Sequence, residues 1–129
     1  MTDTPDETTQ ARRAELRRSY EERTKQAGVF QVRNTKNGRV LLASGLDLHG
    51  PLNRVAFELD NKGCRHPELV RDLRAFARGD FVIEVLEVVV PRDGPDFDPK
   101  KELEILEQKY LASLDRATAY NRDDRIRYP

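Results

Sequence analysis

One stretch, "AGVFQVRNTKNGRVLLASG" at residues 27–45, constrains the fold more than any other part of the chain. Its two halves are rich in β-branched, aromatic and aliphatic residues, a composition that favours two short strands. Between them, Asn37-Gly38 supplies residues that accept the positive φ angles of a tight turn. The loop "NTKNG" exceeds the two-residue minimum, so we expect a bulge or a wider turn. The stretch therefore predicts a β-hairpin that the rest of the fold must accommodate.

Helices and one further strand are predicted after the hairpin. Apolar residues at helical spacing predict helices in "PLNRVAFELDNKG", "PELVRDLRAFARG" and "KKELEILEQKYLASLD". The run "FVIEVLEVVV" is too β-branched for a helix and predicts a strand, which we expect at the centre of the sheet. Together these elements predict an α/β (α+β) domain with a small three-stranded, mostly antiparallel sheet flanked by helices.

The two ends of the chain are predicted to differ from this domain. Residues 1–10 are polar without apolar periodicity, so we expect them to be disordered. Residues 11–26 predict an extra N-terminal helix, basic but with glutamates at intrahelical pairing distance. Residues 122–129 read as an irregular polar tail, which leaves residues 28–121 as the folded domain.

Composition limits the classes of function. The chain has 129 residues, enough for one domain, and 23 basic residues balance 23 acidic ones. With no net charge, any electrostatic function must be local. The single cysteine, Cys64, cannot form an internal disulfide, and the first thirty residues contain no apolar run. We therefore expect a cytoplasmic protein without a membrane partner.

The order of several short motifs resembles the GIY-YIG nuclease superfamily across residues 28–121. "GVF" at 28–30 and "LLA" at 41–43 stand where the two family triplets should be. "FELDNKGCRHPELVRDL" and "FVIEVLE" are similar to the helix pair and third strand, and "LEQKYLASLD" followed by "AYN" to the glutamate helix and its tyrosine-asparagine pair. The resemblance implies a GIY-YIG-like fold.

The family reaction is phosphodiester hydrolysis with one divalent metal, which a glutamate on the last helix holds. The resemblance places Glu107 in that role, with Mg²⁺ or Mn²⁺ as the cofactor if the protein is active. Magnesium prefers oxygen ligands and keeps several waters, so a single carboxylate suffices. Without the resemblance, Glu107 reads as one more surface carboxylate of a helix that also carries Glu102 and Glu104.

Three catalytic positions of the family are substituted here. Phe30 and Leu41 match the triplet tyrosines, and neither side chain has a proton to transfer. Pro51 matches the catalytic arginine, which stabilises charge on the phosphate. Arg54, three residues further on, is the candidate replacement; otherwise it is a surface arginine beside the acidic residue one turn later. His49, expected in a loop, is a candidate general base or a solvated histidine.

Four residues are candidates for nucleic-acid binding: Arg33, Lys36 and Arg39 of the hairpin, and Asn121 after the last helix. Phosphate contacts of this kind predict weak, salt-dependent binding with little sequence preference. Three basic residues such as these are also common on the exposed surface of a hairpin that binds no nucleic acid.

These observations give three hypotheses. The first is a GIY-YIG nuclease-like domain that binds DNA and has lost, or nearly lost, phosphodiester hydrolysis. The second is a divergent but active metal-dependent DNA endonuclease, and the third is a non-catalytic protein-interaction domain with an unknown partner.

Overall fold

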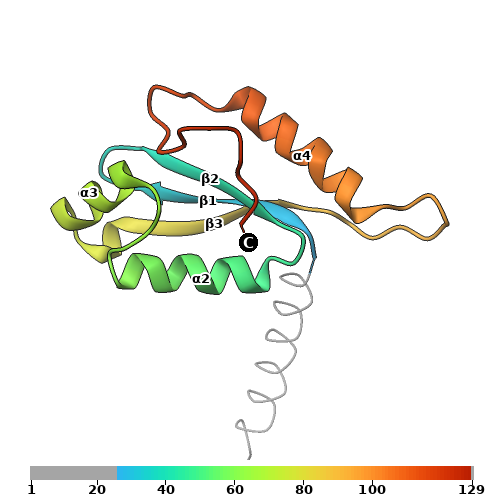
Figure 1. Ribbon diagram of the computed structural model, residues 1–129, viewed down its shortest axis with the longest axis horizontal. Coiled ribbons are helices and arrows are strands. Elements are labelled where there is room, and N and C mark those ends of the chain that lie inside the picture. The colour runs from blue at the N-terminus through green and yellow to red at the C-terminus, as the bar shows by residue number, and fades with distance from the viewer. Residues whose placement is uncertain (1–25, 129) are drawn as a thin grey trace, which may run out of the picture.

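The computed structural model describes residues 26–128 as one layer of strands with helices on both faces (Figure 1). Its strands are β1 (Gly28–Asn34), β2 (Val40–Gly45) and β3 (Phe81–Val88), and its helices are α2 (His49–Asp60), α3 (Pro67–Ala75) and α4 (Pro99–Ser113), with a 3-10 turn at Arg78–Asp80. The predicted disorder at 1–10 and all but the last residue of the predicted helix at 11–26 lie outside the described residues. None of the described helices is long and apolar enough to cross a membrane.

The sheet is antiparallel, with the strand order β2-β1-β3, which confirms the predicted three-stranded architecture. The expectation that residues 81–90 form the central strand is wrong, because β1 holds that position. Strand β1 is buried on both faces, whereas seven of the eight residues of β3 are only half-buried. An apolar run predicts a strand, but here the sheet order follows from β1 pairing with both other strands.

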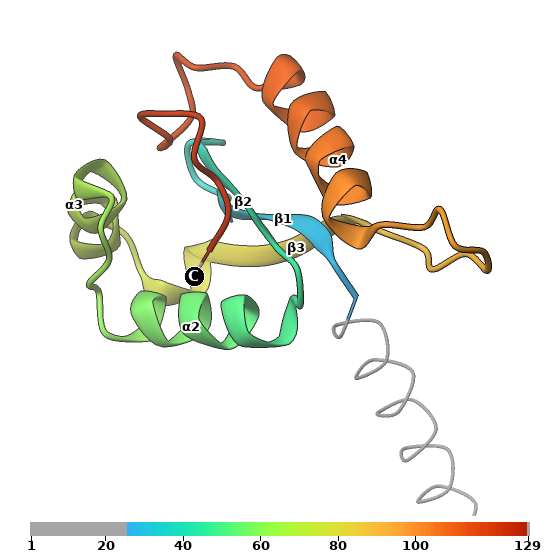
Figure 2. The ribbon, with the colours of Figure 1, turned by 45° about the vertical axis from the view of Figure 1, so that its right-hand side comes forward.

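Two hydrophobic clusters lie on opposite faces of the sheet. Helices α2 and α3 cover one face and α4 covers the other (Figure 2). Side chains of β1 alternate between the clusters, with Phe30 and Val32 facing α2 and Val29 facing α4. The sheet thus separates two small hydrophobic cores and contributes side chains to both.

The first and second helices differ from their predicted limits. Helix α2 begins at His49, so the prediction that His49 lies in a loop is wrong, and Pro51 sits in the first turn of the helix. Proline is tolerated there because the first N–H groups of a helix have no intrahelical partner. Helix α3 ends at Ala75 because Phe76 turns to an extended conformation.

The C-terminal segment, residues 119–128, runs along the free edge of β2. Tyr120 N donates to Val40 O at 2.7 Å, Ser44 N donates to Ile126 O at 2.9 Å, and Tyr128 N donates to Ser44 O at 2.8 Å. Only isolated bridges form, so the segment is irregular in backbone. Its side chains are nonetheless part of the fold, since Ile126 is buried on the α4 side and Tyr128 on the α2 side.

Candidate active site

The two triplets lie on paired strands of the hairpin. Phe30 is opposite Ala43, and Leu41 is opposite Val32, so the two residues that the resemblance places at the tyrosine positions share the α2 face of the sheet. Phe30 is 0% exposed and Leu41 is 1% exposed. A side chain on Gly28 would place its Cβ 2.6 Å from Glu87 O, so this triplet glycine is required by close approach of β3. The triplets are therefore packed as core residues.

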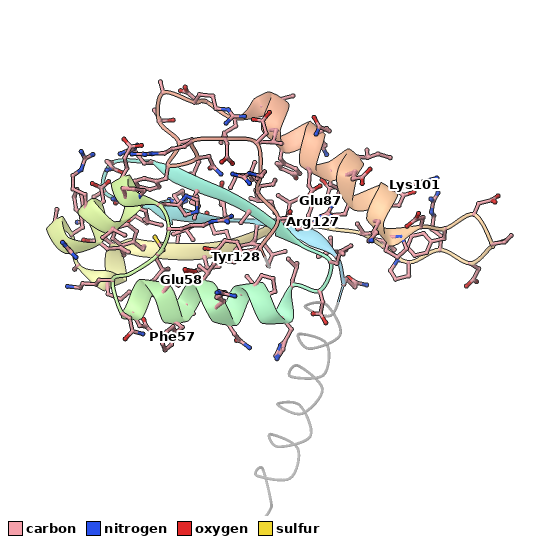
Figure 3. All side chains as sticks on the ribbon, in the orientation of Figure 1. Phe57, Glu58, Glu87, Lys101, Arg127 and Tyr128 are labelled. Atoms are coloured by element: carbon pink, nitrogen blue, oxygen red, sulfur yellow. The ribbon has the colours of Figure 1, made fainter. Side chains whose placement is uncertain are left out.

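Tyr128 of the C-terminal segment covers this face. Its ring lies 6.1 Å from that of Phe30, and its hydroxyl donates to Glu58 Oε1 at 2.9 Å. Figure 3 shows Tyr128 between the sheet and Glu58 of α2. Burial, followed by the nearby Glu58 carboxylate, raises the pKa of Tyr128. Its hydroxyl is thus protonated at neutral pH and acts as a hydrogen-bond donor.

Glu107 of α4 is buried and has three hydrogen-bond donors. Ser44 Oγ donates to Oε2 at 2.5 Å, Arg127 Nε donates to the same oxygen at 3.2 Å, and Arg127 Nη2 donates to Oε1 at 2.9 Å. The Glu107 side chain is 11% exposed and that of Arg127 is 36% exposed. Arg127 therefore makes a two-point ion pair with the carboxylate, which is the strongest geometry for this pairing.

The residues around Glu107 do not fit a divalent cation. A carboxylate offers about four lone-pair positions, and three of them are taken by Ser44 and Arg127. The guanidinium also places a positive charge where the metal would bind. Within residues 26–128, no group of three or more His, Cys, Asp or Glu side chains could hold a metal ion.

The candidate replacements on α2 lie apart from this carboxylate. Pro51 is buried in the first turn and packs against Gly45, where an added Cβ would come 2.8 Å from Pro51 Cγ. Arg54 is exposed and lines a cavity with Tyr128. His49 is exposed, and its Nε2 lies 3.4 Å from Asn53 Nδ2.

No family model matches the chain, and no curated protein matches it in sequence. Two solved structures do resemble it, both of the catalytic domain of the endonuclease I-TevI. One, described as the homing endonuclease, is 20% identical with a TM-score of 0.57, covering 75% of this chain and 98% of that one. The other, a mutant described as the intron endonuclease, is 19% identical with a TM-score of 0.57, covering 77% and 95%. The fold is GIY-YIG-like. At these sequence identities the similarity establishes the fold of this GIY-YIG-like domain. Its chemistry has to be inferred from its own residues.

Two hairpin arginines of the GIY-YIG-like domain are committed to ion pairs. Arg33 donates to Glu84 through Nε at 2.9 Å and Nη2 at 3.1 Å. Hydrogen bonds from Arg33 and then Gln31 lower the pKa of Glu84 to about 2. Arg39 lies 3.3 Å from Glu68 and stacks 4.3 Å above the Tyr120 ring. Lys36 is exposed on the turn and makes no ion pair within residues 26–128.

Asn121 also has a structural partner. Its Oδ1 accepts from Leu42 N at 2.8 Å, and its Nδ2 donates to Leu42 O at 2.9 Å. The side chain thus pairs with the edge of β2 as a neighbouring strand would. Since both of these amide groups are occupied, the observed role of Asn121 is to attach the C-terminal segment to the sheet.

A buried polar network joins the hairpin turn to the C-terminal segment. Tyr120 Oη donates to Asp72 Oδ2 at 2.6 Å and accepts from Asn34 Nδ2 at 3.2 Å. Asn37 Nδ2 donates to the same Asp72 oxygen at 3.2 Å. Burial and then the Asp72 hydrogen bond raise the pKa of Tyr120 to about 12. The network fixes the turn that carries Lys36 and Arg39.

Sequence reasoning missed the residues that now occupy the candidate site, namely Ser44, Arg127 and Tyr128. A usable signal was present in "IRY" at 126–128, where two apolar residues alternate with a polar one. Such alternation is typical of a strand with one residue type per face. In a regular strand Ile126 and Tyr128 would share one face, but in this irregular segment Ile126 lies in the α4-side core and Tyr128 in the α2-side core, while Arg127 contacts Glu107. The pattern therefore indicates that the two apolar residues are buried, but not on which faces.

Proposed function

We propose that this chain is a GIY-YIG-like nuclease domain that no longer hydrolyses phosphodiester bonds through a metal on Glu107 and that binds DNA. The observation that carries the proposal is the occupation of the Glu107 carboxylate by Arg127 and Ser44. A metal ligand with that neighbourhood would have to release a guanidinium before it could take a cation. Magnesium or manganese is therefore not expected to bind.

The loss of chemical groups at the triplets supports the same proposal. Phe30 and Leu41 carry no hydroxyl, and both are buried beneath the C-terminal segment. The hydroxyl of Tyr128, whose ring packs near Phe30, donates to Glu58, and burial raises its pKa. A water-activating group with a pKa near neutrality is what hydrolysis requires.

Hydrolysis is tested with supercoiled plasmid and Mg²⁺ or Mn²⁺. The full chain is expected to leave the plasmid intact under both metals. Glu107→Gln is the matched control, because it keeps the shape of the side chain and removes the charge that a metal needs. Cleavage by the full chain that disappears in folded Glu107→Gln would overturn the proposal and favour the active endonuclease, with Arg54 and His49 as its candidate groups.

DNA binding is tested by the fluorescence anisotropy of a labelled duplex. Binding is expected at about 50 mM salt and is expected to be lost by about 200 mM salt, since phosphate contacts release counterions. An absence of binding even at low salt would refute this half of the proposal and favour the protein-interaction domain. The cytoplasmic location stays a prediction.

A further inference from the structure

Two cavities beside the C-terminal segment have Arg65 in common in their linings. One, of about 220 Å³, is lined by Arg65, His66, Asn121, Arg122, Asp123 and Arg125. The other, of about 380 Å³, is lined by Arg54, Glu58, Cys64, Arg65 and Tyr128. Four exposed arginines thus line these two cavities, together called the hollow, beside α2, the loop after it and the C-terminal segment. We call Arg54, Arg65, Arg122 and Arg125 the arginine strip.

The arginine strip keeps its charge, unlike the hairpin arginines. Arg54, Arg65 and Arg122 make no ion pair within residues 26–128, and Arg125 has one contact of 3.4 Å with Asp123. The other carboxylate in the hollow, Glu58, accepts a hydrogen bond from Tyr128. Four guanidinium groups therefore face two carboxylates, each of which already has a partner.

His66 shows that these charges converge in the hollow. Its pKa is lowered, chiefly by burial and then by the positive charge of Arg65; Asp123 acts in the opposite direction, and the positive charge of Arg122 has a smaller lowering effect. Arg65 belongs to the loop before α3 and Arg122 to the C-terminal segment. Arg65 and Arg122, which are distant in sequence, therefore both lie close enough to the same imidazole to act on it.

We propose that the arginine strip binds the phosphate backbone of duplex DNA. This rests on the proposed function and gives that function a surface other than the hairpin. Guanidinium groups match phosphate oxygens in two-point geometry, and such contacts carry no sequence information. Single strands are a poorer fit, because the aromatic ring in the hollow, Tyr128, is buried and has Arg65 above it at 5.8 Å.

The test measures the affinity of a labelled duplex of about 20 base pairs over a salt series. With up to four phosphate contacts, the slope of log affinity against log salt is expected to be about −3 to −4. Arg65→Glu/Arg122→Glu should lower affinity at low salt more than about tenfold and reduce the slope by about 2 in magnitude. The double variant Arg122→Glu/Arg125→Glu is a second test of the arginine strip, and it leaves the contact of Arg65 with Tyr128 intact.

The matched control is Arg74→Glu/Lys101→Glu, which changes the net charge equally. Both residues are exposed and line neither cavity, and Lys101 lies on α4, well away from Arg127 and Tyr128 (Figure 3). The control should lose much less affinity than either strip variant. Thermal melts of all variants confirm that they are folded.

Each outcome separates the two proposals. If the wild-type chain binds DNA and the strip variants bind as well as the control, the arginine strip is wrong and the proposed function stands. If the wild-type chain does not bind at low salt, both fail. Binding to vesicles rich in phosphatidylserine without binding to the duplex would also overturn the inference, in favour of a lipid headgroup.

Discussion

At the scale of single residues, the contact between Arg127 and Glu107 changes what the carboxylate does. A buried carboxylate must be neutralised by a cation, and in this chain a guanidinium from 20 residues away supplies that charge. Ser44 satisfies a further lone pair of the same carboxylate. The carboxylate therefore serves to hold the C-terminal segment against the sheet.

We expect Arg127→Met to lower the free energy of unfolding by about 2 kcal/mol, because Glu107 then keeps its burial with only Ser44 as a partner. Adding Glu107→Gln to this variant should recover part of the loss, which a double-mutant cycle by urea unfolding would measure. Arg116→Met is the control, since its ion pair with Asp124 is exposed and should contribute less than about 1 kcal/mol. Equal losses from both arginines would contradict the assigned role.

The ion pair between Arg33 and Glu84 predicts a titration at low pH. The pKa of Glu84 is about 2 in the folded state, below the ordinary value of about 4.3 expected when unfolded. Because the folded pKa is the lower one, the stabilising effect is complete above about pH 4.3 and is lost as the pH falls toward 2. Glu84 is 38% exposed, so solvent screening keeps this contribution small.

A carbon NMR titration of the carboxyl group checks this directly. Arg33→Met should move the pKa of Glu84 up toward its ordinary value, because the largest cause of the shift is the Arg33 hydrogen bond. Lys36→Met, an exposed change on the same hairpin, should leave the Glu84 titration where it is. A Glu84 titration near pH 4 in the wild-type chain would show that the pair does not persist in solution.

At the scale of elements, the C-terminal segment acts as an edge partner for β2. A chain ending at Asp124 would lose the buried side chains of Ile126 and Tyr128 and two backbone hydrogen bonds to Ser44. Fully burying side chains of this size contributes about 1.5 to 3 kcal/mol each. Because the truncation also removes Arg127 from buried Glu107, we expect it to cost at least about 3 to 6 kcal/mol, a large part of the stability of a small domain.

Urea unfolding measures the total loss, and hydrogen exchange locates it. In the truncated chain the Ser44 amide loses its acceptor, Ile126 O, and should exchange much faster than the paired amides between β1 and β3. Asp124→Ala, at an exposed position of the same segment, should change stability by less than about 0.5 kcal/mol. A truncated chain as stable as the control would mean that the segment only lies on the surface.

At the scale of the whole molecule, the sequence predicted what depends on local pattern. Asn37-Gly38 predicted the hairpin turn, and Gly38 adopts φ 77° there. The order of the elements predicted a small three-stranded domain flanked by helices, and the order of the short motifs predicted, by resemblance, the GIY-YIG-like fold that the solved structures confirm.

The features that the sequence did not predict depend on contacts between segments that are distant along the chain. The partners of Arg33 and Glu107, namely Glu84 and Arg127, could not be read from spacing, because any of several charges could have met them. The position of β3 at the edge of the sheet could not be predicted either, because composition predicts a strand but not the strands with which it pairs. The polar composition of residues 122–129 likewise did not indicate that Ile126 and Tyr128 are buried.

The C-terminal segment also affects how this molecule reaches its native state. Its hydrogen bonds join residues 70, 79 and 86 positions apart, as in Glu58 with Tyr128, Leu42 with Asn121 and Asn34 with Tyr120. Contacts at such separations slow folding, because a long loop must close before they form. During synthesis, residues 119–128 are made after all three strands, so the edge of β2 stays open until they arrive. An unpaired edge is where chains associate wrongly. Residues 119–128, which are made after all three strands, therefore cover an edge that would otherwise be open to misassembly.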